Sequence, residues 1–133
     1  MRVVFDSNVF VAAFATHGLC HSLFEICLQD HQIVSSDHIL AEVEQKLRQK
    51  ISVPAPVIRE ILSYLRKGCI LDRPVPIPSD ACRDPKDLAV IGLAVAARAE
   101  CLVSGDADLL VLKRYHETDI LSPRQLYDRL RRG

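Results

Sequence analysis

The sequence predicts a single α/β domain over residues 1–133, with three layers in which helices cover both faces of a parallel sheet. Three observations support this fold class. Short apolar runs typical of buried strands alternate with longer segments whose apolar residues recur at helical spacing. The length of 133 residues suits one domain, and no linker or internal repeat divides the chain. Apolar residues make up 49% of the sequence, which is enough to build a core without metal or disulfide staples.

The first half of the chain contains two predicted strands and four predicted helices. The strands are residues 3–5 and 33–34, which are short and rich in Val, Ile and Phe. The helices are expected to begin near Ser7, His21, Ser36 and Pro54. Each carries an apolar stripe at spacings of three and four residues, and Ser36 is typical of a helix N-cap.

The second half contains three further predicted strands, at residues 69–71, 101–103 and 119–121, of which the last has the weakest pattern. A proline-rich segment at 73–78 must be a loop. Asp84-Pro85 is expected to open a helix that is apolar on every side, and such a helix is typically buried between layers. Two further helices are expected, a short one at 108–113 and a terminal one at 123–132.

The charge and cysteine content narrow the possible functions. Seventeen basic residues balance seventeen acidic ones, so any contact with nucleic acid must come from a local patch. The five cysteines are widely spaced and form no C-x-x-C pair, which indicates reduced thiols used as small apolar residues. Asp6 interrupts the apolar start, and the longest apolar stretch has about half the length needed to span a bilayer. We therefore expect a cytoplasmic protein without membrane association.

Carboxylates are placed where a parallel sheet would bring them together. Asp6 and Asp106 follow two predicted strands, and Asp84 and Asp87 open a helix. In open parallel sheets ligands bind beyond the carboxyl ends of the strands, where the following helices also begin. Clustered carboxylates repel one another unless cations or protons are present, and oxygen ligands without His or Cys favour Mg²⁺ or Mn²⁺. Such a site suits metal-assisted phosphodiester hydrolysis.

Each of these acidic residues also has a purely structural interpretation. Asp6 and Asp106 can cap the helices that follow them, and Asp84 with Asp87 at the third helical position resembles a capping box. Asp108 can decorate a first helical turn, and Glu42 can be a solvated residue beside an apolar stripe. The sequence favours a functional site only because these residues occur together.

Four ordered motifs resemble those of the PIN-domain family. V-V-F-D-S-N-V at 3–9 resembles the opening D-x-N motif, and I-L-A-E-V at 39–43 resembles the helix with the conserved glutamate. R-D-P-K-D at 83–87 resembles the third acidic motif, and S-G-D-A-D-L-L at 104–110 resembles [ST]-G-D-x-D-L-L. The resemblance extends to about residue 125. One departure is Leu88, which stands where relatives often carry a second consecutive aspartate.

The resemblance implies five parallel strands in the order 3-2-1-4-5 and a ribonuclease that depends on Mg²⁺ or Mn²⁺. It also implies a toxin of a toxin–antitoxin pair, with a cognate antitoxin as partner and RNA as substrate. The catalytic residues would be Asp6, Glu42, Asp87 and Asp106, and the metal would be held by Asp6, Asp87, Asp106 and Asp108. Supporting roles fall to Asn8, Ser104 and Asp84, with Asp84 a rival of Asp87 for the metal.

Basic residues near these motifs are candidates for contact with RNA phosphates. Arg83 and Lys86 flank the third acidic motif, and Lys46 follows Glu42 on the same helix. The apolar stripe at 57–65 is long enough to support a homodimer, although such stripes more often belong to a core.

Two other functions remain open from the sequence. Leu88 and the zero net charge fit a PIN-like module that binds nucleic acid or protein but has lost its chemistry. A phosphatase or receiver-type domain with a nucleophilic Asp6 is disfavoured, because no D-x-D follows the first strand and no lysine follows a late strand.

Overall fold

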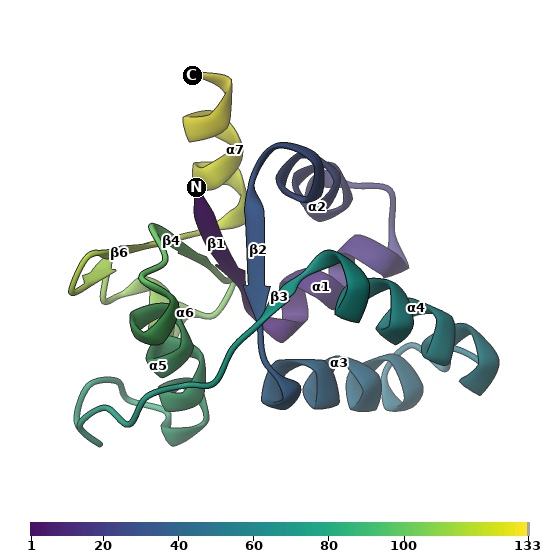
Figure 1. The fold of residues 1–133 in the computed structure, drawn as a ribbon, viewed down its shortest axis with the longest axis horizontal. Coiled ribbons are helices and arrows are strands. Elements are labelled where there is room, and N and C mark those ends of the chain that lie inside the picture. Colours follow the sequence, from purple (N-terminus) through teal and green to yellow (C-terminus); the bar gives the residue numbers. More distant parts are fainter. Residues whose placement is uncertain (133) are drawn as a thin grey trace.

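Six strands form one sheet with the order β3-β2-β1-β4-β6-β5 in a computed structural model that describes residues 1–132 (Figure 1). The strands are β1 (Arg2–Phe5), β2 (Gln32–Ser35), β3 (Ile70–Leu71), β4 (Cys101–Val103), β5 (Arg114–Tyr115) and β6 (Thr118–Leu121). All neighbouring pairs are parallel except β5 and β6. The five predicted parallel strands and their order are confirmed, and the last of them, β6, is fully paired with β4.

The sixth strand, β5, was not predicted. It pairs with β6 as a two-residue hairpin in which Arg114 faces Asp119 and Tyr115 faces Thr118. Hairpins of this size require positive φ in the turn, and sequences usually supply Asn or Gly there. In this turn His116, with a φ of 53°, takes the place of Asn or Gly. The sequence therefore carries none of the usual signals for the turn.

Seven α-helices complete the three predicted layers. They are α1 (Ser7–Ala15), α2 (Leu19–Asp30), α3 (Asp37–Gln49), α4 (Ala55–Gly68), α5 (Leu88–Ala97), α6 (Ala107–Leu110) and α7 (Pro123–Arg131). α5 and α6 lie on one side of the sheet, while α1 to α4 lie on the other, where α7 packs against α2 (Figure 1). Strands β1, β2 and β4 are buried from both sides, as expected of central parallel strands.

No single helix within residues 1–132 is long and apolar enough to cross a bilayer. α1 and α2 reach the required length and composition only as a pair, and that pair is bent by 107°.

Four of the cysteines, Cys27, Cys69, Cys82 and Cys101, are buried in the apolar core, in agreement with the interpretation of the thiols as small apolar residues.

Helix α5 can be apolar on all sides because the sheet covers its inner side and another segment of the chain covers its outer side. Its inner side packs on β1, β2 and β4, while the proline-rich segment at 72–79 crosses its outer side. The Val75 amide donates to the Gly92 carbonyl at 3.2 Å. A Cβ at Gly92 would lie 2.3 Å from the Val75 carbonyl oxygen, so only glycine permits this approach. The predicted burial of α5 is therefore confirmed, and the crossing segment completes its cover.

The entry into α5 differs from the prediction. Pro85–Asp87 forms a 3₁₀ turn, η1, and the α-helix begins only at Leu88. Asp84 caps η1 by accepting from the Lys86 amide at 3.0 Å. The predicted capping box is wrong, because the Asp87 side chain makes no cap hydrogen bond. The tighter turn, closed by the Asp87 amide on the Asp84 carbonyl, leaves the Asp87 carboxyl free to face the end of the sheet.

Candidate active site

Asp6 is held by hydrogen bonds on both carboxylate oxygens at the carboxyl end of β1. Its backbone amide extends the parallel pairing by donating to the Val103 carbonyl at 2.9 Å. Oδ1 accepts from the Ser7 amide at 2.8 Å, which caps α1, and Oδ2 accepts from the Ser104 hydroxyl at 2.8 Å. The residue is only 6% exposed. Asp6 is therefore both a helix cap and a fixed carboxylate at the carboxyl end of the central strand β1.

Ser104 and Asp106 follow β4, the neighbour of β1. Ser104 is fully buried, and its Oγ accepts from the Asp106 amide at 3.0 Å while donating to Asp6. Asp106 caps α6 through a 2.9 Å hydrogen bond from the Asp108 amide to Oδ1. The capping interpretation and the convergence of carboxylates both hold here, because a cap at this end of a parallel sheet necessarily lies at the ligand-binding edge.

Asp87 is the most perturbed acid of the cluster. It is 7% exposed, and no group within residues 1–132 donates a hydrogen bond to its buried Oδ2. Burial, followed by the charges of Asp106, Asp6 and Asp84, raises the pKa of Asp87 to about 7. The protonated carboxyl lies near enough to Asp106 to donate a hydrogen bond to it, which raises the pKa further. Asp6, Asp87 and Asp106 therefore form one interacting group, with Asp84 at its margin.

Glu42 lies beside this group, and the carboxylates that act most strongly on Asp87 are those of Asp106, Asp6 and Asp84 instead. Ser36 caps α3 as predicted, by accepting from the Ile39 amide at 3.2 Å. This start orients the buried stripe of α3 inward and places Glu42 and Lys46, four residues apart, on one face. The side chain of Glu42 is 27% exposed, and its Oε1 lies 3.9 Å from His38 Nε2.

A groove of 650 Å³ runs along that face of α3. We call it the α3 groove, and it is lined by His38, Glu42, Gln45, Lys46, Lys50 and Lys86, together with Ala41 and Gln49. Three ammonium groups and one carboxylate give the α3 groove a positive balance beside the acidic cluster. Lys46 and Lys86, two of the predicted phosphate contacts, are therefore brought to the same surface.

Ser7 is a site residue that the sequence analysis missed. Lys46 Nζ donates to Ser7 Oγ at 2.6 Å, and Ser7 is 1% exposed. This contact holds the Lys46 ammonium at Ser7, the residue that directly follows Asp6 in the chain. The signal in the sequence was a serine directly after a strand-ending aspartate, but nothing local connects it to a lysine 39 positions later.

The remaining predicted residues lie at the rim. Arg83 and Asp108 line a second hollow, on the α6 side of the acidic cluster. Asn8 is exposed on the first turn of α1, and in the described part of the chain its side chain makes no hydrogen bond. Cys82 lines the same hollow as Arg83 and Asp108, and its thiol donates to the Asp84 carbonyl at 3.1 Å. Burial, followed by the charge of Asp87, raises the pKa of the Cys82 thiol.

The acidic cluster suits a divalent cation in the chemistry of its donors. Its ligands are carboxylate oxygens, which Mg²⁺ and Mn²⁺ prefer, and the unpartnered Asp87 Oδ2 requires either a proton or a cation. In their present rotamers, however, no three His, Cys, Asp or Glu side chains of residues 1–132 lie close enough to hold one ion. Binding would therefore draw Asp87 and Asp106 toward the fixed Asp6.

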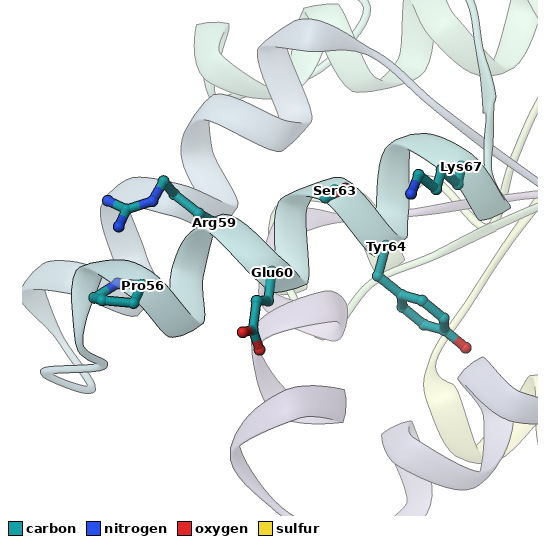
Figure 2. Close-up of a pocket in the computed structure, with 6 residues that line it drawn as sticks. All are labelled: Pro56, Arg59, Glu60, Ser63, Tyr64 and Lys67. Carbon is teal, nitrogen blue, oxygen red and sulfur yellow. The ribbon is translucent and has the colours of Figure 1, made fainter.

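A hollow of 530 Å³ on α4 is the other conspicuous feature of this side of the fold. It is lined by Pro56, Arg59, Glu60, Ser63, Tyr64 and Lys67, and Figure 2 shows Glu60 and Tyr64 projecting to the same side of the helix. No carboxylate of the acidic cluster contributes to it. Most of the apolar stripe considered for a homodimer faces inward, and Ile58 and Leu65 are buried. Val57 and the neighbouring Tyr64 stay exposed.

Comparisons with known proteins agree with this fold. The family model of the PIN domain matches residues 2–108. No curated protein matches the chain. A crystal structure of VapBC2 from Rickettsia felis, bound to a DNA fragment from its promoter, is similar with a TM-score of 0.65 and 16% identity, over 92% of this chain and 98% of that one. VapC20 from Mycobacterium tuberculosis, described as a toxin that cleaves the sarcin–ricin loop, is similar with a TM-score of 0.64 and 11% identity, over 88% and 98%. The match over most of its length places this chain in the PIN-domain family.

Proposed function

We propose that the chain is an endoribonuclease that depends on Mg²⁺ or Mn²⁺ and hydrolyses RNA phosphodiester bonds. The observation that carries the proposal is the buried Oδ2 of Asp87, which lacks a hydrogen-bond donor while facing the charges of Asp6 and Asp106. A carboxylate in that position is stable only when it is protonated or bound to a cation. A divalent ion held there would neutralise the carboxylates and polarise the scissile phosphate.

The side chains of this chain would supply the remaining functions. Asp6 is held in one orientation by Ser104 and by the Ser7 amide, so it offers a fixed ligand oxygen. Asp106 and Asp87 provide the other ligands of the centre. Glu42 and Asp108 border it from opposite sides and extend the acidic set, and Asp84 adds its charge from η1. Lys46 and Lys86 line the α3 groove, where their ammonium groups can contact phosphates of the bound strand.

We also propose that the chain acts as the toxin of a toxin–antitoxin pair in the cytoplasm. The support is membership of the PIN-domain family and the similarity of the fold to VapC20, which is described as a toxin. A cognate antitoxin is then the expected protein partner. A homodimer through the exposed residues of α4 is a further proposal, supported by the exposure of Val57 and Tyr64.

An impaired PIN-like binding module is the second candidate. Two observations favour it, namely the position of Glu42 outside the acidic group and the presence of Leu88 after Asp87. The two candidates differ in their response to metal. An active nuclease requires the carboxylate centre to bind a divalent ion, whereas a binding module does not.

The deciding experiment is a thermal melt with EDTA and with millimolar Mn²⁺, for the wild type and for the Asp6→Asn/Asp106→Asn variant. A ligand present at about 100 times its dissociation constant stabilises the folded state by roughly 2.7 kcal/mol, which raises the melting temperature by several degrees. We expect this rise in the wild type only, together with Mn²⁺-dependent cleavage of RNA that the variant lacks. A wild type that neither gains stability nor cleaves RNA would favour the binding module.

A further inference from the structure

No ligand has been assigned so far to the hollow on the α6 side of the acidic cluster. We call it the α6 hollow, and it measures 630 Å³. It is lined by residues 80–83, which precede η1, and by Ala107, Asp108, Val111 and Leu112 from α6 and its end. This volume lies within the range of pockets that hold small molecules, of roughly 300–1,000 Å³.

The apolar part of the α6 hollow is unusually accessible. Val111 is 70% exposed, which is the largest value among the big apolar side chains of the described residues. Ala81, Ala107 and Leu112 line the same hollow. A hollow with an apolar lining and a few polar groups is typical of sites that bind small molecules.

The polar part of the α6 hollow consists of three charged side chains, those of Asp80, Arg83 and Asp108. None of them makes an ion pair or a side-chain hydrogen bond to another residue in 1–132. The guanidinium of Arg83 can only donate hydrogen bonds, whereas the carboxylate oxygens of Asp80 and Asp108 accept them. A complementary ligand therefore presents acceptors on one edge and donors on another.

The α6 hollow directly adjoins the acidic cluster. The Asp108 amide donates to Asp106 Oδ1 at 2.9 Å, so one wall of the hollow is attached to a proposed metal ligand. Cys82 lies on its other wall, where the charges of Asp87, Asp84 and Asp108 add to burial in raising the pKa of the thiol. The α3 groove reaches the same acidic motif through Lys86, the residue before Asp87. An RNA strand whose phosphate lies at the cluster therefore places a neighbouring nucleotide at the α6 hollow.

We propose that the α6 hollow binds the base of that neighbouring nucleotide and selects guanine. This inference rests on the proposed ribonuclease function. Guanine presents two adjacent acceptors, O6 and N7, to which an arginine fork binds with two hydrogen bonds. Its opposite edge presents two adjacent donors, which match a carboxylate, and single-stranded bases are commonly recognised on both edges. Adenine and uracil have neither of these paired edges, and cytosine lacks the paired donors. The apolar residues contact the face of the base.

The first test measures binding without requiring cleavage. Amide resonances of Ala81, Ala107 and Val111 are followed by NMR during titration with 5′-GMP, 5′-AMP, 5′-CMP and 5′-UMP, each in the presence of EDTA. We expect 5′-GMP to shift these resonances with a dissociation constant about tenfold lower than the other three, since a bidentate contact discriminates strongly against the wrong base. Equal affinities for all four nucleotides, or the same shifts with inorganic phosphate alone, would overturn the proposal.

Two variants and one control make the assignment specific. Val111→Trp fills the α6 hollow, and Arg83→Gln removes the guanidinium fork, so both should abolish the preference for 5′-GMP. Ile70→Trp adds the same indole at another exposed apolar position, on the edge strand β3, and should retain the preference. Circular dichroism melts establish that each variant is folded. Retention of the preference by folded Val111→Trp would place the nucleotide elsewhere and refute the inference.

The second test connects the base to cleavage. Wild type and Val111→Trp cleave a random-sequence RNA pool with Mn²⁺, and the new ends are sequenced. Guanine should be enriched at one fixed position relative to the cut by the wild type, and this enrichment should disappear in Val111→Trp. An unchanged enrichment in the variant contradicts the proposal. Failure of the wild type to cleave any RNA defeats the proposed function instead, while the nucleotide titration still decides whether the α6 hollow selects guanine.

Discussion

The Ser104 hydroxyl donates a 2.8 Å hydrogen bond to Asp6 Oδ2 and accepts a 3.0 Å hydrogen bond from the Asp106 amide. One buried side chain thereby links the residues that follow β1 and β4, the two strands at the point where the sheet order reverses. The link fixes Asp6 in one orientation and sets the start of the turn that carries Asp106. The geometry of the candidate centre therefore depends on a residue that need not touch the metal or the substrate.

Replacing Ser104 by alanine should destabilise the fold. The substitution removes the donor to a buried carboxylate oxygen of Asp6, and hydrogen bonds to charged groups contribute roughly 1.5–3 kcal/mol. We expect a loss of that size in the free energy of unfolding, measured by urea denaturation. Ser63→Ala, at an exposed position on α4, serves as the matched control and should change stability by less than about 0.5 kcal/mol. Equal stabilities of the two variants would show that the link contributes nothing.

The stability of the metal-free protein should fall as the pH rises from about 4 to above 7. Asp87 has a pKa of about 7 in the folded state, against a usual value of 3.8. Between these values the folded chain binds more protons than the unfolded chain, so raising the pH favours unfolding. The stabilising contribution is complete below pH 4 and is lost once the pH passes 7, with an upper bound of about 4 kcal/mol.

This pH dependence can be measured by urea denaturation in EDTA at several pH values. Asp87→Asn cannot ionise at this position, so its stability should depend less on pH over the same range. Addition of Mn²⁺ to the wild type should restore stability above pH 7, where the ionised carboxylate is available. Identical pH profiles of wild type and Asp87→Asn would show that another group is responsible.

Lys46→Ala should weaken RNA binding without unfolding the chain. Lys46 Nζ is held at 2.6 Å from Ser7 Oγ and lines the α3 groove. Loss of one phosphate contact lowers the slope of log affinity against log salt by about 0.7 for a single strand. Fluorescence anisotropy with a labelled RNA at several salt concentrations measures this slope. Lys67→Ala, on α4, provides the control and should leave the slope unchanged; a Lys46→Ala slope equal to that of the wild type would remove Lys46 from the RNA surface.

Gly92→Ala should destabilise the fold by about 1–3 kcal/mol, the usual cost of forcing atoms into a packed interior. Its Cβ would lie 2.3 Å from the Val75 carbonyl oxygen, so the crossing segment must move away from α5. Thermal denaturation measures the effect. Gly105→Ala is the comparison, because nothing lies within 4 Å of a Cβ built there, and its stability should stay close to that of the wild type. A neutral Gly92→Ala would show that the segment has another resting position.

Most of the fold was predictable because its strands and helices carry clear periodic patterns. β1, β2 and β4 each contain a short apolar run, and the apolar stripe of α3 follows a serine cap, so propensity and pattern agree with the packing. β5 escaped prediction because its turn uses His116 with positive φ in place of glycine or asparagine. The 3₁₀ turn at η1 escaped because a proline after an aspartate opens an α-helix and a 3₁₀ turn equally well.

The site was predictable to the extent that the backbone decides it. Parallel strands bring their carboxyl ends to one edge, so Asp6 and Asp106 meet whatever their rotamers. The position of Glu42 depends on how α3 is rotated and on its side-chain rotamer, which spacing along the sequence does not determine. The contact of Ser7 with Lys46, the α3 groove and the α6 hollow all arise from packing between distant segments. Such features follow from the three-dimensional arrangement and leave no local pattern.

The hydrogen bond between Ser104 and Asp6 joins residues 98 positions apart, and this separation has a consequence for the synthesis of the protein. A growing chain that has already formed β1, β2 and their helices still lacks the strand that completes the carboxylate centre. The centre can assemble only after β4 and the turn to Asp106 have left the ribosome, and parallel pairing of this range forms late in folding. Under the proposed ribonuclease function, a nascent chain is therefore expected to be inactive until this segment has emerged.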